Sequence, residues 1–248
     1  MRLHCRLYFF HVCLVLGVAF AFNGSLAAQV QVPFVGCKSD GQAGPQQPPT
    51  SAGLEIRLEA SLAKRVALYK AILGDPVLGP RGWSCFEVYG SSGSSLFVTP
   101  KSIEWADIVS PKWEGITGDG IEATTTYWDG SGQILVAKVV ARVFPAYRWL
   151  ASGVIAEFKS VGDFPFGPFP ADRLKYLNER VVEYETPARL QGLGTAGRLE
   201  FHPNNDPIHG VAIMNTQDSR LKHLAVRLPK NMNNLLRTII TQFEAGEL

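Results

Sequence analysis

The spacing of apolar residues predicts three amphipathic helices. In residues 59–73, 146–159 and 233–244, apolar side chains recur every three or four positions, and charged residues fall between them. Each apolar stripe is confined to one face. Such single-faced stripes are typical of helices that lie on a sheet rather than in a closed bundle.

Alternation of apolar and polar residues predicts strands in much of the remaining chain. The third and fourth predicted strands flank Asp129-Gly130, a dipeptide typical of tight hairpins. Because hairpins outnumber strand–helix–strand units, we expect an α+β fold with a mostly antiparallel sheet and three helices packed on it. The predicted strands are residues 85–89, 96–99, 121–128, 133–144, 180–185, 210–214 and 222–228.

The N-terminus has the pattern of a Sec-type signal peptide. Arg2 and Arg6 precede an apolar run over residues 7–22, and small residues follow it, with cleavage expected after Ala27 or Ala28. The alternative is a membrane anchor, but the run is shorter than the roughly 20 residues that a spanning helix needs. We therefore expect a periplasmic or secreted protein with no transmembrane segment after cleavage.

Loss of the signal peptide changes the charge balance. The whole chain has 24 Lys and Arg against 22 Asp and Glu, and two of the positive charges are Arg2 and Arg6. The mature chain is thus balanced at 22 of each sign. Proteins that bind nucleic acid carry an excess of positive charge to neutralise phosphates. The balance therefore argues against a nucleic-acid partner.

Two cysteines, Cys37 and Cys85, remain after cleavage, and we expect them to form a disulfide in an oxidising compartment. The alternative, a redox-active thiol, would favour a closer pair. We divide the chain into a signal peptide (1–27), an N-terminal arm with a proline-rich linker (28–53) and a single α+β domain (54–248). A bridge would hold the arm against that domain.

Candidate chemistry elsewhere in the chain is weak. Ser61 satisfies the pattern S-x-x-K, but so does a second serine, and His202 and His209 bracket a sequence typical of a turn. We predict no catalytic residue, no metal ligand and no cofactor from these patterns. A Ser-His-Asp relay through His223, assembled from separated residues, stays open because such relays form in space.

The most unusual segment is the loop at residues 163–170, where prolines alternate with aromatic rings. Its three phenylalanines are Phe164, Phe166 and Phe169. One interpretation is a cap that buries the rings over the sheet. The other is an aromatic rim that binds a ligand or partner, since proline lowers the entropy cost of presenting it. Asp172 and Arg173 could add polar contacts.

Two stretches, residues 32–42 and 80–93, resemble an uncharacterised family of exported proteins of Gram-negative bacteria. The resemblance continues through residues 164–168 and 181–184 to the C-terminal helix, so it covers most of the mature chain. It implies an exported single domain and no known activity.

Together these features predict a monomeric, envelope-associated binding or interaction domain. Its partner is an unknown envelope protein or a small ligand, with Phe164, Phe166 and Phe169 as the contact surface. The alternative is a periplasmic hydrolase whose site is assembled from separated residues.

Overall fold

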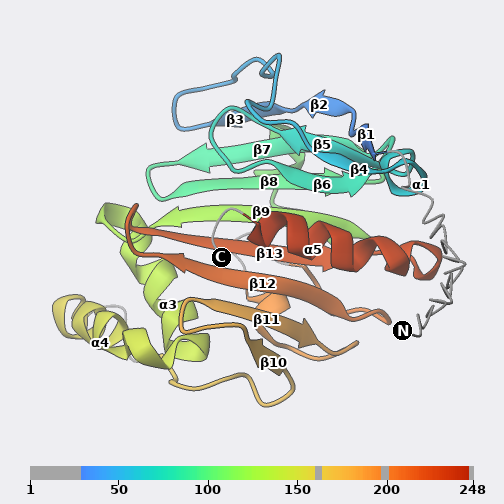
Figure 1. Cartoon of the computed structure of the whole chain (residues 1–248). Helices are drawn as coiled ribbons and strands as arrows, with labels where there is room; N and C mark the ends of the chain where they lie inside the picture. The colour runs from blue at the N-terminus through green and yellow to red at the C-terminus, as the bar shows by residue number, and fades with distance from the viewer. Residues whose placement is uncertain (1–28, 160–163, 197–200, 246–248) are drawn as a thin grey trace, which may run out of the picture.

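The computed structural model describes residues 29–159, 164–196 and 201–245 (Figure 1). The predicted signal peptide lies outside the described residues. The α-helices are α1 (Ala60–Ala63), α2 (Trp105–Ile108), α3 (Gln133–Val143), α4 (Arg148–Glu157) and α5 (Leu236–Glu244). The strands are β1 (Gln29–Gln31), β2 (Phe34–Gly36), β3 (Lys38–Gly41), β4 (Arg57–Glu59), β5 (Val66–Lys70), β6 (Val77–Pro80), β7 (Ser84–Gly90), β8 (Gly93–Thr99), β9 (Gly120–Tyr127), β10 (Arg173–Tyr176), β11 (Val181–Thr186), β12 (Ile208–Asn215) and β13 (Arg220–Arg227).

The fold is α+β, but its sheets are mixed rather than mostly antiparallel. The large sheet has eight strands in the order β10-β11-β12-β13-β9-β8-β7-β3, and the small sheet has three in the order β2-β5-β6. β3 pairs in parallel with β7, and β2 pairs in parallel with β5. Both parallel strands come from the segment that the sequence analysis assigned to an arm. At three and four residues they are too short for alternation to reveal them.

The expectation of three helices is also wrong, because the described residues form five α-helices. Two of them, α1 and α2, have four residues each, too few for a periodic signal. Two of the three predicted helices, at residues 146–159 and 233–244, appear as α4 and α5. Most of the predicted strands also appear, including the β7–β8 hairpin.

Two predicted elements have the opposite type. The strand predicted at residues 133–144 is instead helix α3 over residues 133–143. Val136, Ala137, Val140 and Ala141 make an equally good helical stripe, and they are buried together with Val143. Of the helix predicted at residues 59–73, only the part that forms α1 is helical, and Val66–Lys70 is instead strand β5. Four consecutive β5 residues, beginning at Val66, are buried, as in a strand covered on both faces.

The large sheet separates two hydrophobic cores. One core lies between the sheet, α5 and the small sheet, which Figure 1 shows in front. The other contains the buried residues of α3 and α4 on the opposite face. Alternate residues of a strand point to opposite faces, and β13 is an example, with Leu224 in the first core and Ala225 in the second. No helix in the described ranges is both long and apolar enough to cross a membrane.

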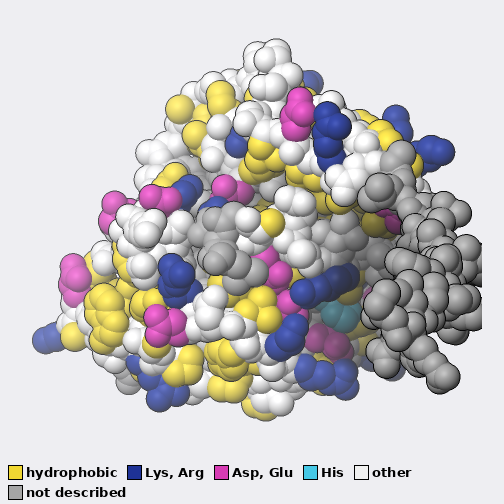
Figure 2. Space-filling model, in the orientation of Figure 1, with side chains coloured by type: hydrophobic (Ala, Val, Ile, Leu, Met, Phe, Trp, Pro, Cys, Tyr) yellow, Lys and Arg dark blue, Asp and Glu magenta, His cyan; other side chains and the backbone are white. Residues whose placement is uncertain are grey.

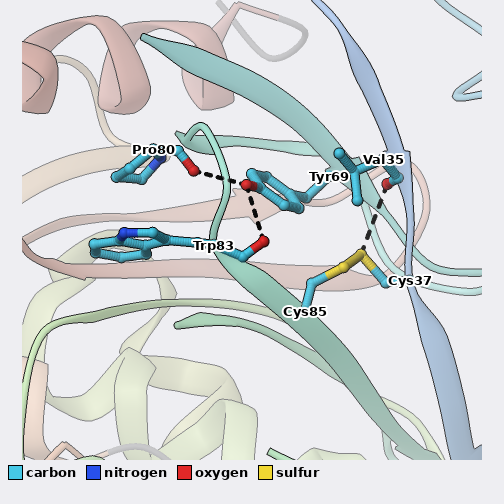
Figure 3. The surroundings of a disulfide bond; sticks show 6 residues. All are labelled: Val35, Cys37, Tyr69, Pro80, Trp83 and Cys85. Atoms are coloured by element: carbon cyan, nitrogen blue, oxygen red, sulfur yellow. Dashed lines mark hydrogen bonds between the residues drawn. A yellow bond between two sulfur atoms is a disulfide. The ribbon is translucent and has the colours of Figure 1, made fainter. Parts of the chain in front are cut away.

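The predicted disulfide between Cys37 and Cys85 is confirmed, with a Cα–Cα distance of 5.3 Å. Figure 3 shows it beside Tyr69, whose hydroxyl donates to the Pro80 carbonyl at 2.6 Å. Burial raises the pKa of Tyr69 to about 12. Cys37 lies where the chain passes from the small sheet to the large one, so the bridge ties this crossing to β7.

Candidate functional site

The phenylalanine loop, residues 164–170 as described, is attached to the C-terminal end of α3. Gly167 has a φ of 91°, a left-handed conformation that glycine adopts without strain. Its N–H donates to the Ala141 carbonyl at 2.8 Å, and its own carbonyl accepts from Arg142 at 3.3 Å. The last carbonyls of a helix need partners from outside it. The loop supplies one of them and is thereby fixed beside the helix.

Arg142 is held against an aromatic ring of the same loop. Its guanidinium carbon lies 4.1 Å from the centre of the Phe169 ring, within the range of a cation–π contact. Asp172, just after the loop, accepts hydrogen bonds from the Leu193 N–H and the Thr186 hydroxyl, each at 2.7 Å. Burial raises the pKa of Asp172, while these bonds and nearby Arg142 oppose the shift. Asp172 thus joins the loop to the segment that carries Leu193.

Helix α3, the phenylalanine loop and the segment around Leu193 line a small apolar cavity of about 150 Å³. We call it the proximal cavity. An apolar cavity of this size holds about one aromatic ring. The described residues that line it include two cations and no carboxylate. They are Lys138, Val139, Arg142, Phe164, Pro165, Phe169, Leu193 and Ala196. Lys138 is exposed and makes no ion pair within the described residues.

Two further cavities continue along α3. The central cavity, of about 60 Å³, shares Lys138 and Val139 with the proximal one and adds His223. The distal cavity, of about 200 Å³, shares Leu135 with the central one. Leu135, Val139 and Arg142 lie on one side of the helix, at spacings of four and three residues. The three cavities therefore form a single row along α3, here called the α3 groove.

The floor of the α3 groove becomes more polar away from the phenylalanine loop. The distal cavity is lined by hydroxyl-bearing Ser95, Thr124 and Thr126, with Trp105 and Val109 exposed at its rim. The Ser95 and Thr124 hydroxyl oxygens are 3.0 Å apart. Thr124 also donates to a Glu122 carboxylate oxygen at 3.3 Å.

His223 lies opposite Thr124 on the neighbouring strand and stacks on Tyr184, with ring centres 5.4 Å apart. Its Nε2 is buried and has no hydrogen-bond partner among the described residues. Burial lowers the pKa of His223 to about 4. A general base works best with a pKa near the operating pH. Thr124 lies between Ser95 and His223 in the sheet, so these two residues form no hydrogen-bonded relay of the kind that such a hydrolase needs.

The other residues weighed in the sequence lie apart. Ser61 is exposed and donates to Glu59 at 2.9 Å. His202 is also exposed. His209 lies on the opposite face of the sheet from His223, and its Nδ1 is 3.9 Å from a carboxylate oxygen of Glu185. In the described part of the chain, no group of three His, Cys, Asp or Glu side chains is arranged to hold a metal.

Another cavity, of about 320 Å³, is a surface depression between α5 and the β10–β12 strands. Figure 2 shows this face, where basic and acidic side chains gather side by side. Its charges pair with one another. The pairs are Arg173–Glu185 at 2.8 Å, Lys175–Glu183 at 3.2 Å and Arg237–Glu183. Because this ladder satisfies its own charges, we take the α3 groove as the candidate site.

The structure divides the three phenylalanines. Phe164 and Phe169 are partly buried and line the proximal cavity, whereas Phe166 is 42% exposed. The exposure of Phe166 alone does not distinguish a cap from a binding rim. Lys138 and Arg142 are site residues that the sequence did not reveal, because residues 133–144 were expected to form a strand. Residues four positions apart share a face in a strand as well, but they are direct neighbours only on a helix.

No family model, curated protein or solved structure matches this chain.

Proposed function

We propose that this protein is an exported, envelope-associated binding domain whose site is the proximal cavity. Its ligand is an amphipathic anion, with an apolar group against Phe164 and Phe169 and an acidic group at Lys138 and Arg142. The observation that carries the proposal is a ring-sized apolar cavity whose described lining includes two cations and no carboxylate.

The fixed position of Arg142 supports this proposal. Its contacts with Phe169 and Gly167 orient the guanidinium before any ligand arrives, and such preorganisation lowers the entropy cost of binding. Asp172 offsets part of this charge, but its carboxylate oxygens already accept hydrogen bonds from Leu193 and Thr186. Lys138 adds a second, exposed positive charge one helical turn away.

Export is supported by the Cys37–Cys85 disulfide, because such bonds persist in oxidising compartments. The family resemblance and the N-terminal pattern point the same way. The periplasm or the exterior of a Gram-negative cell is thus the proposed location.

The test uses 4-phenylbutanoate as the probe, with the alcohol and the amine of the same skeleton as controls. The acid should bind at least about tenfold more tightly than the amine, because one charge-assisted hydrogen bond is worth about 1.5–3 kcal/mol. Lys138→Met should weaken the acid about fivefold to tenfold and leave the alcohol unchanged. Lys64→Met, an exposed lysine beside α1, is the matched control and should change neither.

Equal binding of the acid and the amine would refute the anionic part of the proposal. Loss of binding in Lys64→Met as well as Lys138→Met would place the ligand elsewhere. If no probe binds, the proximal cavity is only a packing defect beneath a cap.

A further inference from the structure

We infer that the α3 groove recognises the free C-terminus of an extended peptide. The terminal carboxylate lies at Lys138 and Arg142, the last side chain fills the proximal cavity, and the preceding residues extend toward Trp105. This inference rests on the proposed function and deepens it, because it states which class of amphipathic anion the site takes.

The arrangement of charge and apolar surface fits a chain end. In a peptide, the terminal carboxylate and the last side chain share one Cα atom, so one cavity must accept both. The proximal cavity offers a ring-sized apolar space and two cations on adjacent turns of α3. Capture of a C-terminal carboxylate is an established mode of peptide recognition.

The length of the groove also fits. Leu135, which lines the central and distal cavities, and Arg142 are seven residues apart on α3. At 1.5 Å per residue the helix rises about 10 Å between them. An extended chain spans about 3.3–3.6 Å per residue, so about three peptide residues cover this distance.

The polarity of the floor distinguishes a peptide from a simple fatty acid. Beyond the proximal cavity the lining includes Thr124 and Thr126, and Ser95 follows in the distal cavity. A hydroxyl can donate one hydrogen bond and accept two. Thr124 donates to Glu122 and Ser95 bonds to Thr124, so both hydroxyls keep lone pairs that can accept from peptide N–H groups. Backbone amides of a peptide can use these groups, whereas an alkyl chain would leave them facing an apolar surface.

The three volumes predict a sequence preference. The proximal cavity, about 150 Å³, suits an aromatic last residue. Side chains alternate along an extended chain, so the middle residue crosses the central cavity, about 60 Å³, with its side chain pointing away from the groove. The distal cavity, about 200 Å³, has an apolar rim of Trp105, Ile108 and Val109 and suits a larger apolar side chain. The preferred end therefore has a large apolar third-last residue and an aromatic last residue with a free carboxylate.

The test compares synthetic peptides on the disulfide-bonded protein by isothermal titration calorimetry. Acetyl-Leu-Ala-Phe with a free carboxylate should bind at least about tenfold more tightly than its C-terminal amide. Acetyl-Gly-Ala-Phe, which has no apolar side chain for the distal cavity, should also bind about tenfold more weakly than acetyl-Leu-Ala-Phe. Neither comparison needs a variant, so misfolding cannot obscure the result.

A variant then tests the path of the peptide. Leu135→Trp fills the boundary between the central and distal cavities, so it should reduce the affinity for acetyl-Leu-Ala-Phe to that for acetyl-phenylalanine. Binding of acetyl-phenylalanine itself should stay unchanged. Ala156→Trp, on an exposed position of α4, is the matched control and should alter neither.

The two proposals can fail separately. If 4-phenylbutanoate binds as proposed but the peptide acid and amide bind equally, or Leu135→Trp has no effect, the peptide inference is wrong and the binding site stands. If 4-phenylbutanoate and acetyl-phenylalanine both fail to bind, the proposed function is wrong, and the inference falls with it.

Discussion

His223 should make the stability of this protein depend on pH. The ring is buried in the wall of the central cavity, and burial lowers the pKa of His223 from 6.5 to about 4. In the unfolded chain the imidazole keeps its ordinary pKa, so the unfolded state binds a proton first as the pH falls. The contribution of neutral His223 to stability is therefore complete above pH 6.5 and is lost progressively as the pH falls toward 4.

The linkage relation gives the size of the effect. With these two pKa values, protonation in the unfolded state should cost about 2 kcal/mol of folding free energy between pH 7 and pH 5. Urea unfolding at both pH values measures it. His223→Gln should lose about 2 kcal/mol less than the wild type over this interval, whereas His202→Gln, which changes an exposed histidine, should behave like the wild type.

His209, whose pKa is also lowered by burial, affects the wild type and His223→Gln alike and cancels in their difference. An identical pH dependence in His223→Gln and the wild type would refute the reasoning. It would mean that His223 is protonated without cost in the folded state, and so is better solvated than the structure shows.

Three other predictions concern the disulfide, the loop and export. Replacing both Cys37 and Cys85 by Ala should destabilise the protein by up to about 4 kcal/mol in urea unfolding, since the bridge closes a loop of 48 residues; no loss would show that the strands hold this segment unaided. Phe169→Ala should cost about 2 kcal/mol because the ring is only partly buried, whereas Phe166→Ala should leave the melting temperature nearly unchanged; equal effects would contradict the structure. Mass spectrometry of the exported protein should find a chain that starts at Ala28 or Gln29, and an intact N-terminus would restore the membrane-anchor alternative.

The sequence predicted correctly the elements whose apolar residues fit either helical spacing or strand alternation, but not both. The β7–β8 hairpin, β13 and α5 alternate or repeat clearly, and all three appear. Residues 133–143 are apolar at nearly every position, so alternation and helical spacing fit equally well. Only packing against the sheet selects the helix, since Val136, Ala137, Val140 and Ala141 then face the core together.

The candidate site could be predicted only in part for the same reason. The phenylalanine loop was recognisable from its composition, and Phe164 and Phe169 do line the proximal cavity. Its other walls come from α3 and from the segment around Leu193. This segment is positioned by a hydrogen bond from the Leu193 N–H to Asp172, a contact between residues 21 positions apart that no local pattern encodes.

The most direct test of the central claim is to locate the bound anion by NMR. With methyl-labelled protein, 4-phenylbutanoate should shift the signals of Val139 and Leu193, which line the proximal cavity, and leave those of Leu236 and Ile240 on the opposite face unchanged. Shifts confined to Leu236 and Ile240, or no saturable shift at Val139 and Leu193, would contradict the account.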